Sequence, residues 1–160
     1  MTSMPTTRSL LTALALLLTA AFTAPGPSQA NTERHEHAVG FSVNDARLRW
    51  LPGDLPLAGY FALTNTGQRT ARLVGAASPA FARVMLHRST HRGGVAHMEH
   101  VEGVDIAPGK TLHFAPGGYH LMLMKRRHRL NPGDSVPVTL RFADGRELSA
   151  TFRVVGAGAQ

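Results

Sequence analysis

Cysteine is absent from the 160 residues. Without a thiol the chain has no disulfide, no zinc-thiolate centre and no cysteine nucleophile. A blue-copper centre is excluded as well, because it needs a cysteine sulfur on the metal. Thiol-disulfide reductase activity is excluded for the same reason. The fold must therefore be held together by its apolar core alone.

Long apolar runs are scarce, and the one that stands out lies near the N-terminus. Leu10 to Ala24 follows the charge of Arg8 and is interrupted only by threonines. It is shorter than the ~20 residues of a transmembrane helix, and Ser28-Gln29-Ala30 offers the small residues of a signal-peptidase site. We predict a signal peptide over residues 1–30, cleavage after Ala30 and a periplasmic protein without stable membrane insertion. An uncleaved membrane anchor is the alternative.

Acidic residues and lysine are both in short supply. The chain has 10 Asp and Glu against 17 Lys and Arg, and Lys110 and Lys125 are its only lysines. Such an excess indicates an acidic partner, an anionic membrane surface or nucleic acid, and export argues against nucleic acid. A GC-rich genome also favours arginine over lysine, so composition accounts for part of this bias.

Helical periodicity is missing from residues 39–155, where short apolar segments alternate with Pro, Gly and Asn turns. We predict strands over residues 41–50, 59–64, 72–76, 81–88, 95–101, 111–114, 119–124, 136–142 and 147–154. Strands at this spacing indicate an all-β Greek-key sandwich or barrel. We expect a single domain over 39–155, a flexible histidine-containing arm over 31–38 and a frayed tail over 156–160.

Histidine and methionine gather in one window: seven of nine histidines and four of six methionines lie between positions 85 and 128. Alternation along a strand puts His120, Met122 and Met124 on one face, and likewise pairs Met85 with His87. Thioether and imidazole, without carboxylate or thiolate, favour Cu(I) over Zn(II), Ca(II) or Mg(II).

The spacing of four of these residues resembles the motif of the periplasmic PCuAC-type copper chaperones. His87 is followed after ten residues by Met98, which is followed after twenty-one residues by His120-Leu121-Met122. Four further blocks look like conserved segments of that family, namely Gly59–Gly67, Leu73–Ser78, Pro116–Leu123 and Gly133–Leu140. The similarity covers roughly residues 39–155.

This resemblance implies a cupredoxin-like sandwich that binds one Cu(I) per chain through His87, Met98, His120 and Met122. It also implies delivery of copper to the CuA-domain subunit of cytochrome c oxidase, alongside a Sco-type protein, without catalysis. Four protein ligands would leave no open position for oxygen, which argues against a copper oxidase or monooxygenase. We expect a monomer. Copper scavenging or resistance without dedicated delivery is the alternative function.

The other histidines have simpler interpretations. We expect His91, His97 and His100 to be solvated loop residues, with a copper-capturing rim as the alternative. His35 and His37 are expected to belong to a polar leader, with weak Cu(II) binding as the alternative.

Two methionines, one arginine and a basic run in this window remain to be interpreted. Met85 and Met124 are expected to serve in packing rather than ligation. Arg88 stands where many relatives carry an acidic residue. The basic run from Lys125 to Arg129 is expected to be a solvated turn, with partner docking as the alternative.

Overall fold

The structure, a computed structural model, describes residues 36–38 and 40–158. These residues belong to the unit Glu33–Gln160. The expected signal peptide and His35 lie outside the described residues. None of the described segments is helical, and no helix able to cross a membrane occurs among them. The strands are β1 (Glu36–Ala38), β2 (Phe41–Arg49), β3 (Leu57–Asn65), β4 (Ala71–Ala77), β5 (Phe81–Arg92), β6 (Val95–His100), β7 (Val104–Ile106), β8 (Thr111–Phe114), β9 (Tyr119–Arg126), β10 (Ser135–Phe142) and β11 (Glu147–Val155).

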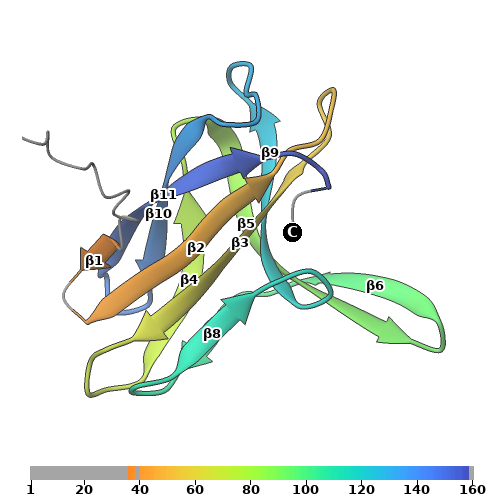
Figure 1. Ribbon diagram of the computed structural model, residues 1–160. Helices are drawn as coiled ribbons and strands as arrows, with labels where there is room; N and C mark the ends of the chain where they lie inside the picture. The colour runs from red at the N-terminus through yellow and green to blue at the C-terminus, as the bar shows by residue number, and fades with distance from the viewer. Residues whose placement is uncertain (1–35, 39, 159–160) are drawn as a thin grey trace, which may run out of the picture. The chain divides into compact units, whose positions relative to one another are not determined.

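All strands join one hydrogen-bonded sheet in the order β6-β5-β9-β8-β3-β2-β11-β10-β4-β7, with β1 beside β2. The pairings are antiparallel except for β2 with β11 and β8 with β9. The sheet folds over on itself, so that β4 packs against β5 around a common core (Figure 1). This arrangement confirms the predicted all-β sandwich.

The core is built by strict alternation of side chains. In β10 and β11 every second residue, from Val136 to Phe142 and from Leu148 to Val154, is almost completely buried. The same alternation positions the histidines and methionines. Leu86 of β5 and Leu121 and Leu123 of β9 point into the core, which forces their neighbours in the chain to the opposite face.

Three features of the strand prediction were wrong. β7 was not predicted, because three residues are too few to show an alternating pattern. Glu36–Ala38 form β1 within the expected arm, since an edge strand needs only backbone partners, which β2 supplies. β5 also continues to Arg92 instead of ending at residue 88, because its end pairs with β6 along the whole hairpin.

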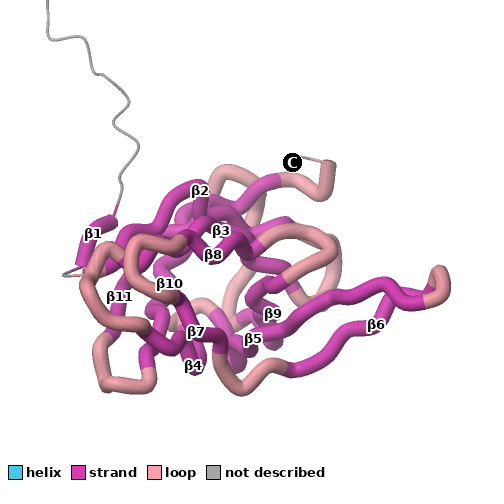
Figure 2. The backbone as a smooth tube through the Cα atoms, turned by 90° about the horizontal axis from the view of Figure 1, so that it is seen from below, coloured by secondary structure: helices cyan, strands magenta, loops and turns pink. Residues whose placement is uncertain are grey.

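The β5–β6 hairpin projects from the body of the domain (Figures 1 and 2). Its turn consists of Gly93 and Gly94, with φ of 58° and 79°. Two successive positive φ values form the two-residue turn that suits the twist of a hairpin, and glycine adopts them without strain. Every residue of β6 is exposed. The hairpin is therefore held by backbone pairing and not by burial.

Candidate metal centre

Three histidines form a row across three adjacent strands. His87 of β5 is directly opposite His120 of β9 on one side and His100 of β6 on the other. Opposed residues of an antiparallel pair project to the same face. The ring centroids of His87 and His120 are 5.9 Å apart, and those of His87 and His100 are 5.7 Å apart.

The hydrogen bonding of His120 identifies its free nitrogen. Nδ1 lies 3.1 Å from the carbonyl oxygen of Gly118. A carbonyl only accepts, so Nδ1 carries the proton and donates, and Nε2 keeps the lone pair that binds a metal. Hydrogen bonds of this kind fix the ring orientation of metal-binding histidines. His120 is only 6% exposed, so its orientation is also fixed by packing.

His87 has no hydrogen-bond partner at either ring nitrogen, although both atoms are buried. A buried polar atom without a partner costs about 1–3 kcal/mol, and a bound metal ion would remove that cost at one nitrogen. Burial lowers the pKa of His87, and the neighbouring imidazoles of His120 and His100 lower it further. The ring is thereby held in the neutral form that a metal requires.

Both predicted methionine ligands line one pocket with His120. The pocket has a volume of about 370 Å³, and Met98 and Met122 contribute to its wall. Met122 follows His120 by two residues on β9 and is half-buried, whereas Met98 on β6 is 55% exposed. The rest of the wall comes largely from the segment after β2 and the start of β3, namely Leu51, Leu55, Pro56, Leu57 and Ala58. His87 is outside this lining and adjoins it through the ring of His120.

Met85 and Met124, the methionines assigned to packing, lie on the same face of their strands as the predicted ligands. Met85 is opposite Met122, and Met124 is opposite Arg83. Neither methionine belongs to the pocket wall. Arg88 points to the other face, where its guanidinium lies 5.3 Å from the ring centre of Tyr119. Its positive charge is therefore directed away from the row of histidines.

The donor set of this pocket is soft and neutral. In the described part of the chain, no three His, Asp or Glu side chains are placed to hold a metal ion together. The four predicted ligands include only two imidazoles, and their remaining donors are thioethers. Such a set suits Cu(I) and not the hard cations, which prefer oxygen ligands.

His91, His97 and His100 were expected to be solvated loop residues. Their side chains are exposed, but the assignment to loops was wrong, because His91 is on β5 and the other two are on β6. His100 lies beside His87. The two-residue turn at Gly93 and Gly94 pairs residue 92 with 95, and counting outward pairs 87 with 100. The hairpin register, had it been followed, would have revealed this neighbour from the sequence.

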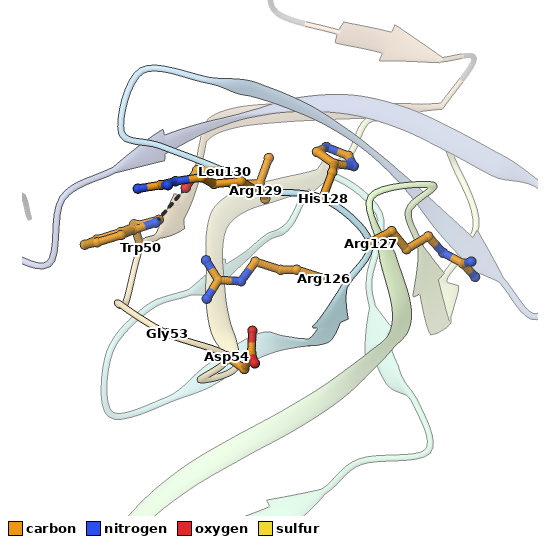
Figure 3. Close-up of a pocket in the computed structure, with 8 residues that line it drawn as sticks. All are labelled: Trp50, Gly53, Asp54, Arg126, Arg127, His128, Arg129 and Leu130. Carbon is orange, nitrogen blue, oxygen red and sulfur yellow. Dashed lines mark hydrogen bonds between the residues drawn. The ribbon is translucent and has the colours of Figure 1, made fainter.

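A second pocket, of about 400 Å³, lies beside the basic run and is lined by Trp50, Gly53, Asp54 and residues 126–130 (Figure 3). Trp50 donates a hydrogen bond from Nε1 to the carbonyl of Leu130 at 2.8 Å, and this bond joins its two sides. Arg126, Arg127 and Arg129 form no ion pair with any described residue. The pocket therefore carries more positive than negative charge, with three arginines in its wall against the single carboxylate of Asp54.

The segment of residues 50–56 connects the two pockets. Trp50, Gly53 and Asp54 line the basic pocket, while Leu51 and Leu55 line the pocket of the methionines. The same short segment thus contributes to the wall of the basic pocket and to the wall of the pocket with the candidate metal ligands.

Residues 41–154 match the family described as "LpqE-like: Putative lipoprotein LpqE-like". The chain belongs to the LpqE-like family. This LpqE-like protein is 38% identical over 120 residues to "Putative lipoprotein Lxx21020" of Leifsonia xyli subsp. xyli, across 74% of this chain and 71% of that protein. It is 30% identical over 98 residues to "Uncharacterized protein RP573" of Rickettsia prowazekii, across 61% of this chain and 54% of that protein.

Solved structures share the fold of this LpqE-like protein. The apo PCuAC domain of PmoF2 superposes with a TM-score of 0.65 at 23% identity, covering 79% of this chain and 98% of that one. The solution structure of CuI-DR1885 from Deinococcus radiodurans gives a TM-score of 0.58 at 36% identity, covering 71% of this chain and 76% of that one. The copper-bound PCuAC domain of PmoF2 gives a TM-score of 0.62 at 25% identity, covering 77% of this chain and 99% of that one. The fold is the cupredoxin-like sandwich of these domains.

Proposed function

We propose that this LpqE-like protein is an exported copper chaperone that carries one Cu(I) at His87, Met98, His120 and Met122. The observation that supports this proposal most directly is the pocket shared by Met98, His120 and Met122, with the unpartnered nitrogens of His87 beside it. Copper-bound relatives, CuI-DR1885 and the PmoF2 domain, support the choice of metal. We also propose the signal peptide over residues 1–30 and a periplasmic location.

The donor set explains how a carrier both holds and releases its metal. Two thioethers and two imidazoles are neutral ligands, so no thiolate charge has to be given up when the ion leaves. Thioethers also form no disulfides in an oxidising compartment. Met98 is exposed on the β5–β6 hairpin, so a recipient has direct access to one of the four ligands.

We propose the CuA-domain subunit of cytochrome c oxidase as the recipient, with a Sco-type protein as the further partner. The basic pocket supplies the docking surface. Its arginines attract acidic groups, and complementary charge accelerates encounter and fixes orientation. Because residues 50–56 line both pockets, an acidic surface docked there would lie next to the copper site.

The metal assignment is tested by X-ray absorption on the Cu(I)-loaded protein, together with competition titration against a chromophoric Cu(I) chelator. We expect one Cu(I) per chain with both sulfur and nitrogen neighbours, and marked preference over Zn(II). A spectrum with nitrogen and oxygen neighbours only would contradict the assignment.

Delivery is tested separately from binding. The loaded protein is mixed with an isolated apo CuA domain, and copper in each protein is measured after separation. Transfer to the CuA domain is the expected result. Retention of all copper by a protein that binds it tightly would favour scavenging over delivery.

A further inference from the structure

The position of His100 gives His87 two imidazole neighbours where the proposed copper site uses one. The row His100–His87–His120 has nearly equal spacing, with centroid separations of 5.7 and 5.9 Å. The rings of each pair are steeply inclined, at 69° and 62°. His87 is therefore placed alike toward both partners, although they belong to strands on opposite sides of β5.

Either pair is close enough to hold one ion. A metal–imidazole bond is ~2.0 Å long, so two nitrogens on one ion lie up to ~4 Å apart and their ring centroids up to ~6 Å. Both observed separations are within this limit. Three imidazoles do not converge in the described structure, so the pairs are alternatives that share His87.

The two outer histidines differ sharply in burial. His120 is 6% exposed and oriented by the carbonyl of Gly118. His100, like all of β6, is exposed and lies on the projecting hairpin. A metal held by His87 and His100 therefore has one exposed ligand, His100, within reach of solvent and of a partner protein. A metal held by His87 and His120 adjoins the pocket of the methionines.

We propose that His87 and His100 form a second, outer copper-binding pair through which Cu(I) enters and leaves the inner site. The inference rests on the proposed copper-carrying function. The ion exchanges His100 for His120 while His87 stays bound, so that one copper–nitrogen bond forms as the other breaks. No electron is transferred, and the ion is never released to water between the two positions. A d¹⁰ ion has no geometric preference from its d electrons, which makes a two-imidazole stage accessible to Cu(I).

This role predicts a kinetic effect without an equilibrium one. An intermediate position accelerates loading and removal by the same factor, so its loss leaves the affinity of the inner site unchanged. His100→Ala removes the outer pair. His97→Ala is the matched control, because His97 is an exposed histidine of the same strand that pairs with Thr90 and, by alternation, faces away from His100.

The test is stopped-flow measurement of Cu(I) loading, and of its removal by a chromophoric Cu(I) chelator, beside equilibrium titration of the same proteins. We expect His100→Ala to slow both rates by about tenfold or more, which corresponds to a barrier to copper exchange raised by ~1.4 kcal/mol or more. The equilibrium affinity should stay within error of the wild type, and His97→Ala should change neither quantity.

Wild-type exchange rates in His100→Ala would overturn the inference while leaving the proposed function intact. A loss of affinity as large as the loss of rate would also overturn it, because His100 would then be a ligand of the stable site. If the wild-type protein itself binds no Cu(I), the proposed function fails and this inference fails with it. Thermal melts verify the fold of each variant. We expect no loss of stability in His100→Ala, because the side chain of His100 is exposed.

Discussion

The imidazole rings of His87 and His120 lie 5.9 Å apart on directly opposed residues of β5 and β9. Their separation is set by the core on the other side of the sheet. Leu86 and Leu121, the neighbours of these histidines in the chain, are also opposed and are almost completely buried. A one-residue slip of either strand would turn its leucines outward. The packing that stabilises the sandwich therefore also fixes the pair of ligands.

Met122→Leu should cripple copper retention and leave the fold nearly intact. Leucine and methionine have similar volumes, and the exchange typically costs under ~1.5 kcal/mol even in a core. Met122 is half-buried and lines the pocket with His120, so the variant loses a sulfur ligand and little packing. Competition against a Cu(I) chromophore, beside a thermal melt, measures both effects.

Met124→Leu is the control for that variant. Met124 is on the same face of the same strand, four residues from His120 or ~13 Å by the strand rise, and outside the pocket wall. We expect unchanged copper affinity. If copper is lost in Met124→Leu and retained in Met122→Leu, the assignment of ligands on β9 is wrong.

The Cu(I) affinity should fall as the pH is lowered. At most two protons, one on each histidine, compete with each copper ion, so the affinity should fall by at most a factor of about one hundred per pH unit. His87 and His120 bind copper only as neutral rings, and protons compete with the metal. Because the pKa of His87 is lowered, mainly by burial, this ring stays neutral to a lower pH than an ordinary imidazole, whose pKa is ~6.5. NMR titration of the apo protein should show this low midpoint. An affinity that stays flat from about pH 8 to below the midpoint that this titration finds for His87 would mean that these histidines are not ligands.

The same lowered pKa of His87 makes the apo protein sensitive to acid. Below the pKa of the unfolded chain, the unfolded state takes up a proton that the folded state resists. The free energy of unfolding is therefore fully retained above the ordinary imidazole pKa and decreases as the pH falls toward the lowered pKa. In His87→Gln this part of the decrease should disappear. Urea denaturation of both proteins across this range, without metal, gives the two slopes, and equal slopes would contradict the assignment.

Removing charge from the basic pocket should slow copper transfer without weakening copper binding. Arg126 and Arg129 line this pocket and form no ion pair with described residues. The double variant Arg126→Ala/Arg129→Ala should transfer copper more slowly to an apo CuA domain at low salt and depend less steeply on ionic strength. Arg69→Ala/Arg153→Ala is the control, because it removes the same two charges from exposed arginines outside the pocket. An equal effect of both variants would indicate general charge attraction and no docking site.

The sequence predicted the parts of this structure that depend on local patterns. Alternation along β10 and β11 gave two core strands, and alternation in β9 correctly placed His120 and Met122 on one face. The features that could not be predicted from the sequence depend on pairing between distant segments. The importance of His100 arises only from the β5–β6 register, and the walls contributed by Leu51 and Leu55 come from a turn far from the ligands in sequence. Neither relationship leaves a periodic trace in the chain.

One ligand of the proposed site differs from the other three in what holds it in place. His87, His120 and Met122 stand on strands whose other face is in the core, while Met98 is on β6, a strand without a single buried side chain. Segments of this kind open by local unfolding far below the free energy of global unfolding. A copper ion bound at the proposed site would link β6 to the sandwich, so that copper occupancy and the order of β6 would be coupled. A recipient that drew β6 outward would then remove one thioether from the ion while the sandwich stayed folded.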